Sequence, residues 1–184
     1  MKEKTIYALG FFDGVHIGHA ALLKACRELA AEARCRFGVI TFGVHPDALG
    51  QAPRLINTLA DRERLLRENF GVETVATLPF DENMHSCPWR DFLDMLRRDY
   101  GAAGFVCGED FRFGAQGAGN ALRLAHYCRG AGLAWAVVPE QTLNGVRISS
   151  TYIRARIEDG DMATAVKFLG HPQLLTGTVV HGRH

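Results

Sequence analysis

Short apolar runs alternate along the chain with longer segments of helical periodicity. Five such runs have the length of strands, and they cover residues 5–9, 36–42, 72–80, 104–108 and 134–139. Strands that alternate with helical segments are typical of βαβ units, in which the strands pair in parallel. The pattern therefore predicts an α/β fold built around a parallel sheet.

The helical segments lie between and after these runs. Apolar residues at three- and four-residue steps predict a helix over about residues 18–34 and another over about residues 120–131. A further helix, between the third and fourth strands, has Trp89, Phe92, Leu93 and Leu96 on one face. The Asn144-Gly145 pair suits a tight hairpin turn, and residues 149–170 have the pattern of two short helices separated at Gly160.

Length and composition place this pattern in one globular domain. The chain has 184 residues, of which 47% are hydrophobic, and its 21 basic and 20 acidic residues give a formal net charge of +1. This charge predicts no general attraction to nucleic acid or to an anionic membrane. The five cysteines form no Cys-x-x-Cys pair, and no segment is apolar over about 18 residues. We expect a soluble, cytoplasmic protein without disulfides; composition indicates no oligomeric state.

The stretch Gly-Phe-Phe-Asp-Gly-Val-His-Ile-Gly-His at residues 10–19 lies where the first strand ends and the first helix begins. In an open parallel sheet this is the usual ligand crevice. Glycines let the backbone approach a phosphate, and a helix N-terminus favours negative charge. His16 and His19 can project from one turn toward neighbouring oxygens of a phosphoryl group. The stretch favours phosphoryl or nucleotidyl transfer, with a tight turn capped by chance as the alternative.

The common phosphate-binding motifs are absent, because the chain has no G-x-x-x-x-G-K-[ST] and no G-x-G-x-x-G after the first strand. Residues 16–19 instead resemble the His-x-Gly-His signature of the nucleotidyltransferase superfamily. Four blocks, GFFDGVHIGH, TFGVHP, GEDFRFG and RISSTYIR, occur in the same order as in the adenylyltransferase module of bacterial bifunctional riboflavin kinase/FAD synthetases. The resemblance implies an α/β fold with a Rossmann-like, doubly wound parallel sheet of the His-x-Gly-His type. It also implies an enzyme that converts ATP and FMN into FAD and pyrophosphate, with Mg²⁺ accompanying ATP.

The resemblance also assigns residues to ATP. It implies that His16 and His19 lie against the triphosphate and stabilise the transition state, while Gly10, Phe11 and Gly18 let the backbone pack against ATP. Asp13 either holds the turn or helps to place Mg²⁺ through water, and no metal ligand is identified.

The block RISSTYIR is the second cluster assigned to ATP. Ser149 or Ser150 suits a helix N-cap, so that the first turn points free N–H groups toward a ligand. By resemblance Ser150, Thr151 and Arg154 grip the β- and γ-phosphates, with Arg147 close by and Arg154 counted among the catalytic residues. A solvated, basic helix start is the alternative.

The blocks GEDFRFG and TFGVHP are assigned to the flavin. The resemblance implies that Phe111 or Phe113 stacks on the ring system and that Asp110 bonds a polar edge or the ribityl chain, although Phe113 also suits the core. His45 matches a polar position that faces the acceptor. Gly43 and Val44 depart from the family pattern, in which an acidic residue and a proline are common.

Other acceptors remain as alternatives: nicotinamide mononucleotide, phosphopantetheine, or none in a module that binds flavin or nucleotide without catalysis. The remaining histidines, His85, His126, His171, His181 and His184, are expected at the surface or in packing. Residues 1–170 are expected to form the adenylyltransferase domain. Residues 171–184 resemble the first strand of a riboflavin kinase domain, and no kinase activity is expected from this chain.

Overall fold

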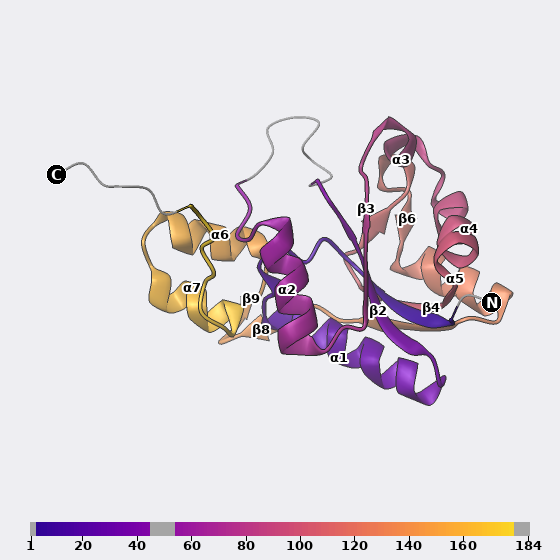
Figure 1. Ribbon diagram of the computed structural model, residues 1–184, viewed down its shortest axis with the longest axis horizontal. Helices are drawn as coiled ribbons and strands as arrows, with labels where there is room; N and C mark the ends of the chain where they lie inside the picture. The colour runs from indigo at the N-terminus through magenta and orange to yellow at the C-terminus, as the bar shows by residue number, and fades with distance from the viewer. Residues whose placement is uncertain (1–2, 45–53, 179–184) are drawn as a thin grey trace.

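A sheet of five parallel strands, in the order β3-β2-β1-β4-β7, forms the centre of the molecule (Figure 1). The computed structural model describes residues 3–44 and 54–178. The strands are β1 (Thr5–Leu9), β2 (Arg36–Phe42), β3 (Thr74–Leu78), β4 (Ala102–Gly108) and β7 (Ala134–Val138). All five strands expected from the apolar runs are present, and the Rossmann-like α/β prediction is confirmed.

Helices cover both faces of the sheet. On one face α1 (Ile17–Glu32) and α2 (Leu59–Phe70) pack their apolar sides against β1 and β2. On the other face α4 (Trp89–Tyr100) and α5 (Ala121–Ala131) enclose a second cluster centred on Phe92, Phe105 and Leu124. Figure 1 shows the strands running between α1, below them, and α4, above them.

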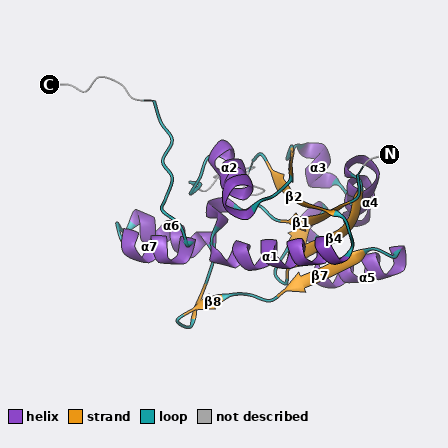
Figure 2. Cartoon of the chain, turned by 60° about the horizontal axis from the view of Figure 1, so that its bottom comes forward, coloured by secondary structure: helices purple, strands orange, loops and turns teal. Residues whose placement is uncertain are grey.

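A smaller unit follows the sheet. The hairpin β8 (Thr142–Leu143) and β9 (Val146–Arg147) turns at Asn144 and Gly145, which both have positive φ, as the Asn-Gly pair predicts. Then α6 (Ser150–Glu158) and α7 (Met162–Leu169) pack around Ile153 and Phe168, with a break at Gly160. Figure 2 shows this pair beside the N-terminal end of α1, and Ile17 packs against it.

The sequence pattern did not predict α2, the short helix α3 (Glu82–Ser86) or the small hairpin of β5 (Arg112–Phe113) and β6 (Gly119–Asn120). The buried side of α2 contains two charged residues, Asp61 and Arg62, next to Leu65 and Leu66. An apolar periodicity is therefore not visible in the sequence of this helix. The first helix begins at residue 17 rather than 18 and ends at residue 32, since residues 33 and 34 turn toward β2.

The strand order changes direction between β1 and β4. From β1 the chain adds β2 and β3 on one side, and then β4 and β7 on the other. A crevice outside the carboxyl ends of β1 and β4 is the expected ligand site of such a sheet. Residues 174–178 form neither helix nor strand, and residues 179–184 of the expected kinase-like strand lie outside the described residues. Within the described ranges, no helix is long and apolar enough to cross a membrane.

Candidate active site

The chain leaves β1 through a strained turn. Phe12 and Val15 adopt φ values of 59° and 42°, and Gly14 between them has φ 79°. A non-glycine residue in this region costs about 1–3 kcal/mol and persists only where its surroundings hold it. Here both side chains are fully buried in the core beneath α1. Packing of Phe12 and Val15 therefore fixes the turn that brings the first turn of α1 to the crevice.

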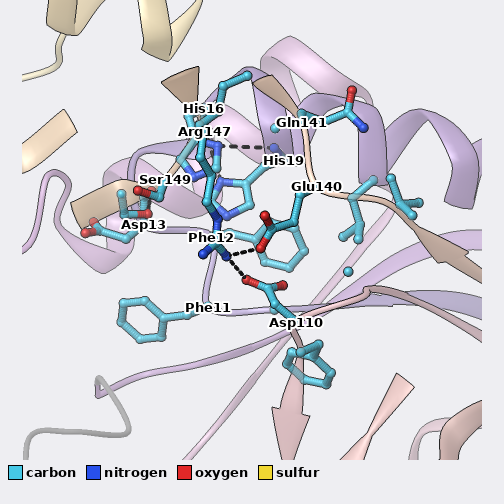
Figure 3. A pocket seen from close by; sticks show the side chains of 18 of the residues that line it. Phe11, Phe12, Asp13, His16, His19, Asp110, Glu140, Gln141, Arg147 and Ser149 are labelled. Carbon is cyan, nitrogen blue, oxygen red and sulfur yellow. Dashed lines mark hydrogen bonds and ion pairs between the residues drawn. The ribbon is translucent and has the colours of Figure 1, made fainter. Parts of the chain in front are cut away.

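His16 and His19 cap α1 reciprocally. The His19 backbone N–H donates to His16 Nδ1, and the His16 backbone N–H donates to His19 Nδ1, each over 3.2 Å. The two rings stack with centroids 3.6 Å apart and an interplanar angle of 11° (Figure 3). An Nδ1 that accepts a hydrogen bond carries no proton, so the bonds assign the proton of each neutral ring to Nε2. The turn thus holds two imidazole Nε2–H donors side by side.

Both histidines are held in the neutral form. Burial lowers the pKa of His16 to about 4. Burial also lowers the pKa of His19 well below its ordinary value, and the charges of His16 and Arg62 add to the effect. At neutral pH both rings are therefore hydrogen-bond donors without charge.

This pKa shift predicts a loss of stability in weak acid. Since the folded state keeps His16 neutral down to about pH 4, the unfolded chain binds more protons between about pH 6.5 and pH 4. The stabilisation is fully present above pH 6.5 and is lost as the pH falls, at about 1.4 kcal/mol per pH unit, for a total of about 3 kcal/mol. Urea unfolding at a series of pH values measures it. The variant His16→Asn, which keeps a capping side chain, should show a shallower dependence; an equal slope in both proteins would contradict the assignment.

Gly18 provides the room for this arrangement. A Cβ at residue 18 would lie 3.2 Å from both Cε1 and Nδ1 of the His16 ring. The absence of a side chain at Gly18 therefore lets the His16 ring lie close to the helix backbone. Residues 17 and 18 occupy the first turn of α1, where backbone N–H groups have no partner within the helix. The start of α1 can therefore offer these donors to an anion.

Asp13 ties three segments together from inside the turn. One carboxylate oxygen accepts from the backbone N–H of Ile56 at 2.9 Å and that of Asn57 at 3.4 Å. The other accepts from Arg154 Nη1 at 2.7 Å. The Asp13 side chain is only 3% exposed. Of the two roles expected for Asp13, its contacts favour holding the turn.

The start of α6 faces the same turn. Ser149 is the N-cap and accepts from the Tyr152 N–H, while the Ser150 hydroxyl donates to the carbonyl of Asp13 at 2.9 Å. Arg154 also donates from Nη2 to Thr151 Oγ1 at 3.2 Å. A guanidinium has five N–H donors, so Arg154 keeps donors for a ligand while it bonds Asp13. The start of α6 is therefore not a freely solvated basic surface.

Arg147 bridges two loops at the rim. Its Nη2 lies 2.6 Å from an Asp110 oxygen and 2.5 Å from a Glu140 oxygen, and Figure 3 shows the guanidinium between the two carboxylates. Asp110 follows β4 and Glu140 follows β7. The three side chains are partly exposed, and they connect the hairpin to the carboxyl edge of the sheet.

These segments enclose a cavity of about 640 Å³, which is in the range of small-molecule sites. Most of the predicted site residues line it: Gly10, Phe11, Asp13, His16, Gly18, His19, Asp110, Phe111, Arg147, Ser150, Thr151 and Arg154. Phe113 does not line it, and His45 lies outside the described residues.

A comparison with protein families identifies the family to which the chain belongs. The model of the FAD synthetase family matches residues 1–152, which include the histidine turn, the loop after β4 and the first residues of α6. The chain belongs to the FAD synthetase family.

Named relatives agree with this membership. The chain is 31% identical over 181 residues to the bifunctional riboflavin kinase/FMN adenylyltransferase of Listeria monocytogenes, covering 96% of this chain and 57% of that protein. It is 34% identical over 187 residues to the protein of the same name from Escherichia coli strain K12, covering 98% and 59%. The chain thus spans less than three fifths of the length of either relative.

Solved structures agree on the fold. A Streptococcus pneumoniae structure described as a macrolide-efflux protein superposes with a TM-score of 0.88 at 31% identity, over all of this chain and 60% of that one. The nicotinic acid mononucleotide adenylyltransferase of Plasmodium falciparum, complexed with NaAD, superposes with a TM-score of 0.53 at 13% identity, over 90% and 89%. The second likeness concerns the fold alone.

Within this FAD synthetase domain, the two phenylalanines after β4 differ in their surroundings. Phe111 lies at the cavity and stacks at 5.6 Å on Phe113. Phe113 is 5% exposed and packs against Phe92 and Trp89 in the core. The ring of Phe113 therefore supports Phe111 from behind, which matches the core alternative for this residue.

Several cavity residues of the FAD synthetase domain were not predicted from the sequence. Glu109, Glu140 and Gln141 line the cavity, as do Phe12 and Ile148. Glu140 follows a predicted strand, so its place at a carboxyl edge was an available signal. His171, expected at the surface or in packing, has Nε2 2.9 Å from the carbonyl oxygen of Gly14, a contact that joins segments 157 residues apart. A contact between residues so far apart in the chain cannot be predicted from a local sequence pattern.

Proposed function

We propose that this chain transfers the adenylyl group of ATP to the phosphate of FMN, giving FAD and pyrophosphate. The observation that carries the proposal is the pair of imidazole Nε2–H groups, which one turn holds in a cavity at the carboxyl edges of β1 and β4. Membership of the FAD synthetase family supports the choice of reaction. The names of the relatives support FMN as the acceptor.

The reaction forms one P–O bond and breaks another. An oxygen of the FMN phosphate attacks the α-phosphorus of ATP, and the bond from that phosphorus to the oxygen bridging to the β-phosphorus breaks, so that pyrophosphate leaves with the bonding electrons. The attacking phosphate is already anionic, so positioning and electrostatic stabilisation supply most of the catalysis. His16 and His19 would donate from Nε2 to phosphate oxygens as their charge changes.

Two helix starts would hold the rest of the triphosphate. In this proposal the free N–H groups of α1, near Gly18, face one part of the phosphate chain, and Ser150, Thr151 and Arg154 at the start of α6 face the β- and γ-phosphates. Gly10 and Phe11 pack against the nucleotide. The bond from Ser150 to the Asp13 carbonyl keeps the two helix starts at a fixed separation.

Mg²⁺ enters this proposal as part of the substrate MgATP. Within residues 3–44 and 54–178, no group of three or more His, Cys, Asp and Glu side chains is placed to hold a metal ion. Both oxygens of Asp13 already accept hydrogen bonds from the protein. Magnesium commonly keeps several water ligands and is coordinated by substrate phosphates. The donor set around Asp13 does not fit a resident metal.

The flavin would lie at the loop after β4. We propose that Phe111 stacks on the ring system and that Asp110, whose carboxylate is held by Arg147, bonds a polar group of FMN. Phe113 acts only by supporting Phe111. A role for His45 at the acceptor stays a prediction on a residue outside the described ranges.

An acceptor panel tests the proposed function. The protein is incubated with MgATP and separately with FMN, nicotinamide mononucleotide and phosphopantetheine, and the products are identified by mass. We expect FAD and pyrophosphate from FMN and no adenylylated product from the other two acceptors. Conversion of another acceptor in place of FMN would overturn the flavin assignment. Binding of ATP and FMN without any product would favour the non-catalytic alternative.

A further inference from the structure

Arg62 is a buried cation behind the cavity. It lies in the first turns of α2 and is 0% exposed, although its neighbours in sequence suggest a solvated helix face. Its Nη1 lies 2.6 Å from the carbonyl oxygen of Phe11, 3.2 Å from that of Phe42 and 3.2 Å from Thr41 Oγ1. The guanidinium thus joins the chain just beyond β1 to the end of β2, at the carboxyl edge of the sheet.

The same guanidinium also covers the ring of Phe11. Its central carbon lies 4.1 Å from the ring centroid, which is the geometry of a cation–π contact. Thr41 adds a second hydrogen bond to the Phe11 carbonyl oxygen at 2.9 Å. Phe11 lines the cavity. Arg62 therefore contacts both the backbone and the ring of one cavity residue.

Burial of this cation is costly. Nε and Nη2 of Arg62 are buried and have no hydrogen-bond partner among the described residues. Asp13 and Glu63 act on Arg62 through their charges, and burial nevertheless lowers its pKa. An apolar side chain would fill such a position at less cost in desolvation. A cation at this position makes two contacts with Phe11 that an apolar side chain could not make, the hydrogen bond to the carbonyl oxygen and the cation–π contact with the ring.

We propose that Arg62 is a positioning residue for adenylyl transfer, which holds Phe11 by its carbonyl and its ring against the nucleotide cavity. This inference rests on the proposed function. Arg62 does not line the cavity, so it acts through Phe11.

The charge of Arg62 also reaches the histidine turn. The groups whose charges act on His19 are His16 and Arg62, and both lower the pKa of His19 in addition to its burial. Removal of the cation should therefore raise the pKa of His19 and make the ring easier to protonate. Because the protein also loses stability in weak acid, the acid limb is compared only at pH values at which each variant is folded, and KM for ATP reports the contact with Phe11 separately.

Kinetics of matched variants test the proposal. We expect Arg62→Met to raise KM for ATP about ten-fold or more and to shift the acid limb of kcat to higher pH, since it removes hydrogen bonds to a charged group. Arg62→Lys should keep the acid limb of the wild-type protein but still raise KM, because an ammonium cannot stack flat on the ring as a guanidinium does. The control is Arg67→Met on the exposed side of α2, which should leave both quantities unchanged.

Thr41→Val keeps the proposal testable if Arg62→Met does not fold. It removes one hydroxyl that bonds the Phe11 carbonyl, and we expect a smaller rise in KM for ATP of about three-fold. Wild-type KM in both Arg62→Lys and Thr41→Val, or in a folded Arg62→Met, would overturn the proposal. If the wild-type protein forms no FAD, the proposed function fails by itself, and the ATP dissociation constants of the same variants then decide on Arg62.

Discussion

Replacement of His19 or His16 by alanine is expected to lower the turnover of FAD formation by about ten- to a thousand-fold at saturating ATP. Each change removes one Nε2–H donor that the capping bonds hold in the cavity, and the loss of a single transition-state donor has effects on this scale. The KM for ATP should change less, because in the proposed site the starts of α1 and α6 would still face the phosphates. Steady-state kinetics with varied ATP and saturating FMN measure both quantities.

Two further variants separate the chemical role of the histidines from their capping role. Asparagine is a preferred N-cap residue, so His16→Asn should preserve the start of α1 while it removes the imidazole donor. We expect this variant to remain folded and to lose turnover as His16→Ala does. His126→Ala, on the exposed side of α5, is the matched control. Wild-type turnover in both His16→Asn and His19→Ala would show that the pair only caps the helix.

Arg154→Ala is expected to damage both stability and the use of ATP. The side chain is 17% exposed and bonds the nearly buried carboxylate of Asp13, and breaking a buried ion pair costs about 3–5 kcal/mol. Loss of a charge-assisted contact to phosphate should also raise KM for ATP about ten-fold or more. Lysine should rescue only in part, because it lacks the planar pair of donors. Melting temperature and steady-state constants for ATP are measured together.

Asp13→Asn distinguishes the two roles of Arg154. The amide oxygen can still accept from the N–H groups of Ile56 and Asn57, but the ion pair with Arg154 is lost. Stability should therefore fall while KM for ATP changes less than in Arg154→Ala. If Arg154→Ala lowers the melting temperature and leaves KM for ATP unchanged, Arg154 serves only to hold the turn. Arg156→Ala, on the same helix but outside the cavity lining, is the control.

The sequence was sufficient for the strands, their parallel pairing and the place of the histidine turn. These features follow from local periodicity and from the position of the glycines and histidines between β1 and α1. The pattern could not show that the rings of His16 and His19 stack or which nitrogen of each carries the proton. Those properties depend on the strained turn, whose φ values at Phe12 and Val15 are fixed by burial in the core.

Contacts between distant segments were out of reach of a local pattern. The bond from Arg154 to Asp13 joins residues 141 positions apart, and the bond from Arg62 to Phe11 joins residues 51 positions apart. In the sequence Arg62 stands in a charged run that resembles a solvated helix face. Only the packing of α2 against the sheet shows that its guanidinium is buried. Phe111 and Phe113 show the same limit. The number of aromatic residues in this loop could not indicate which ring lies in the core and which lies at the cavity.

The central claim is that an oxygen of the FMN phosphate attacks the α-phosphorus of ATP in this cavity. Its most direct test uses FMN whose non-bridging phosphate oxygens carry oxygen-18, incubated with unlabelled MgATP and this protein, with both products analysed by mass spectrometry. We expect FAD that retains all of the label and pyrophosphate that contains none. Absence of FAD, or label in the pyrophosphate, would contradict the account.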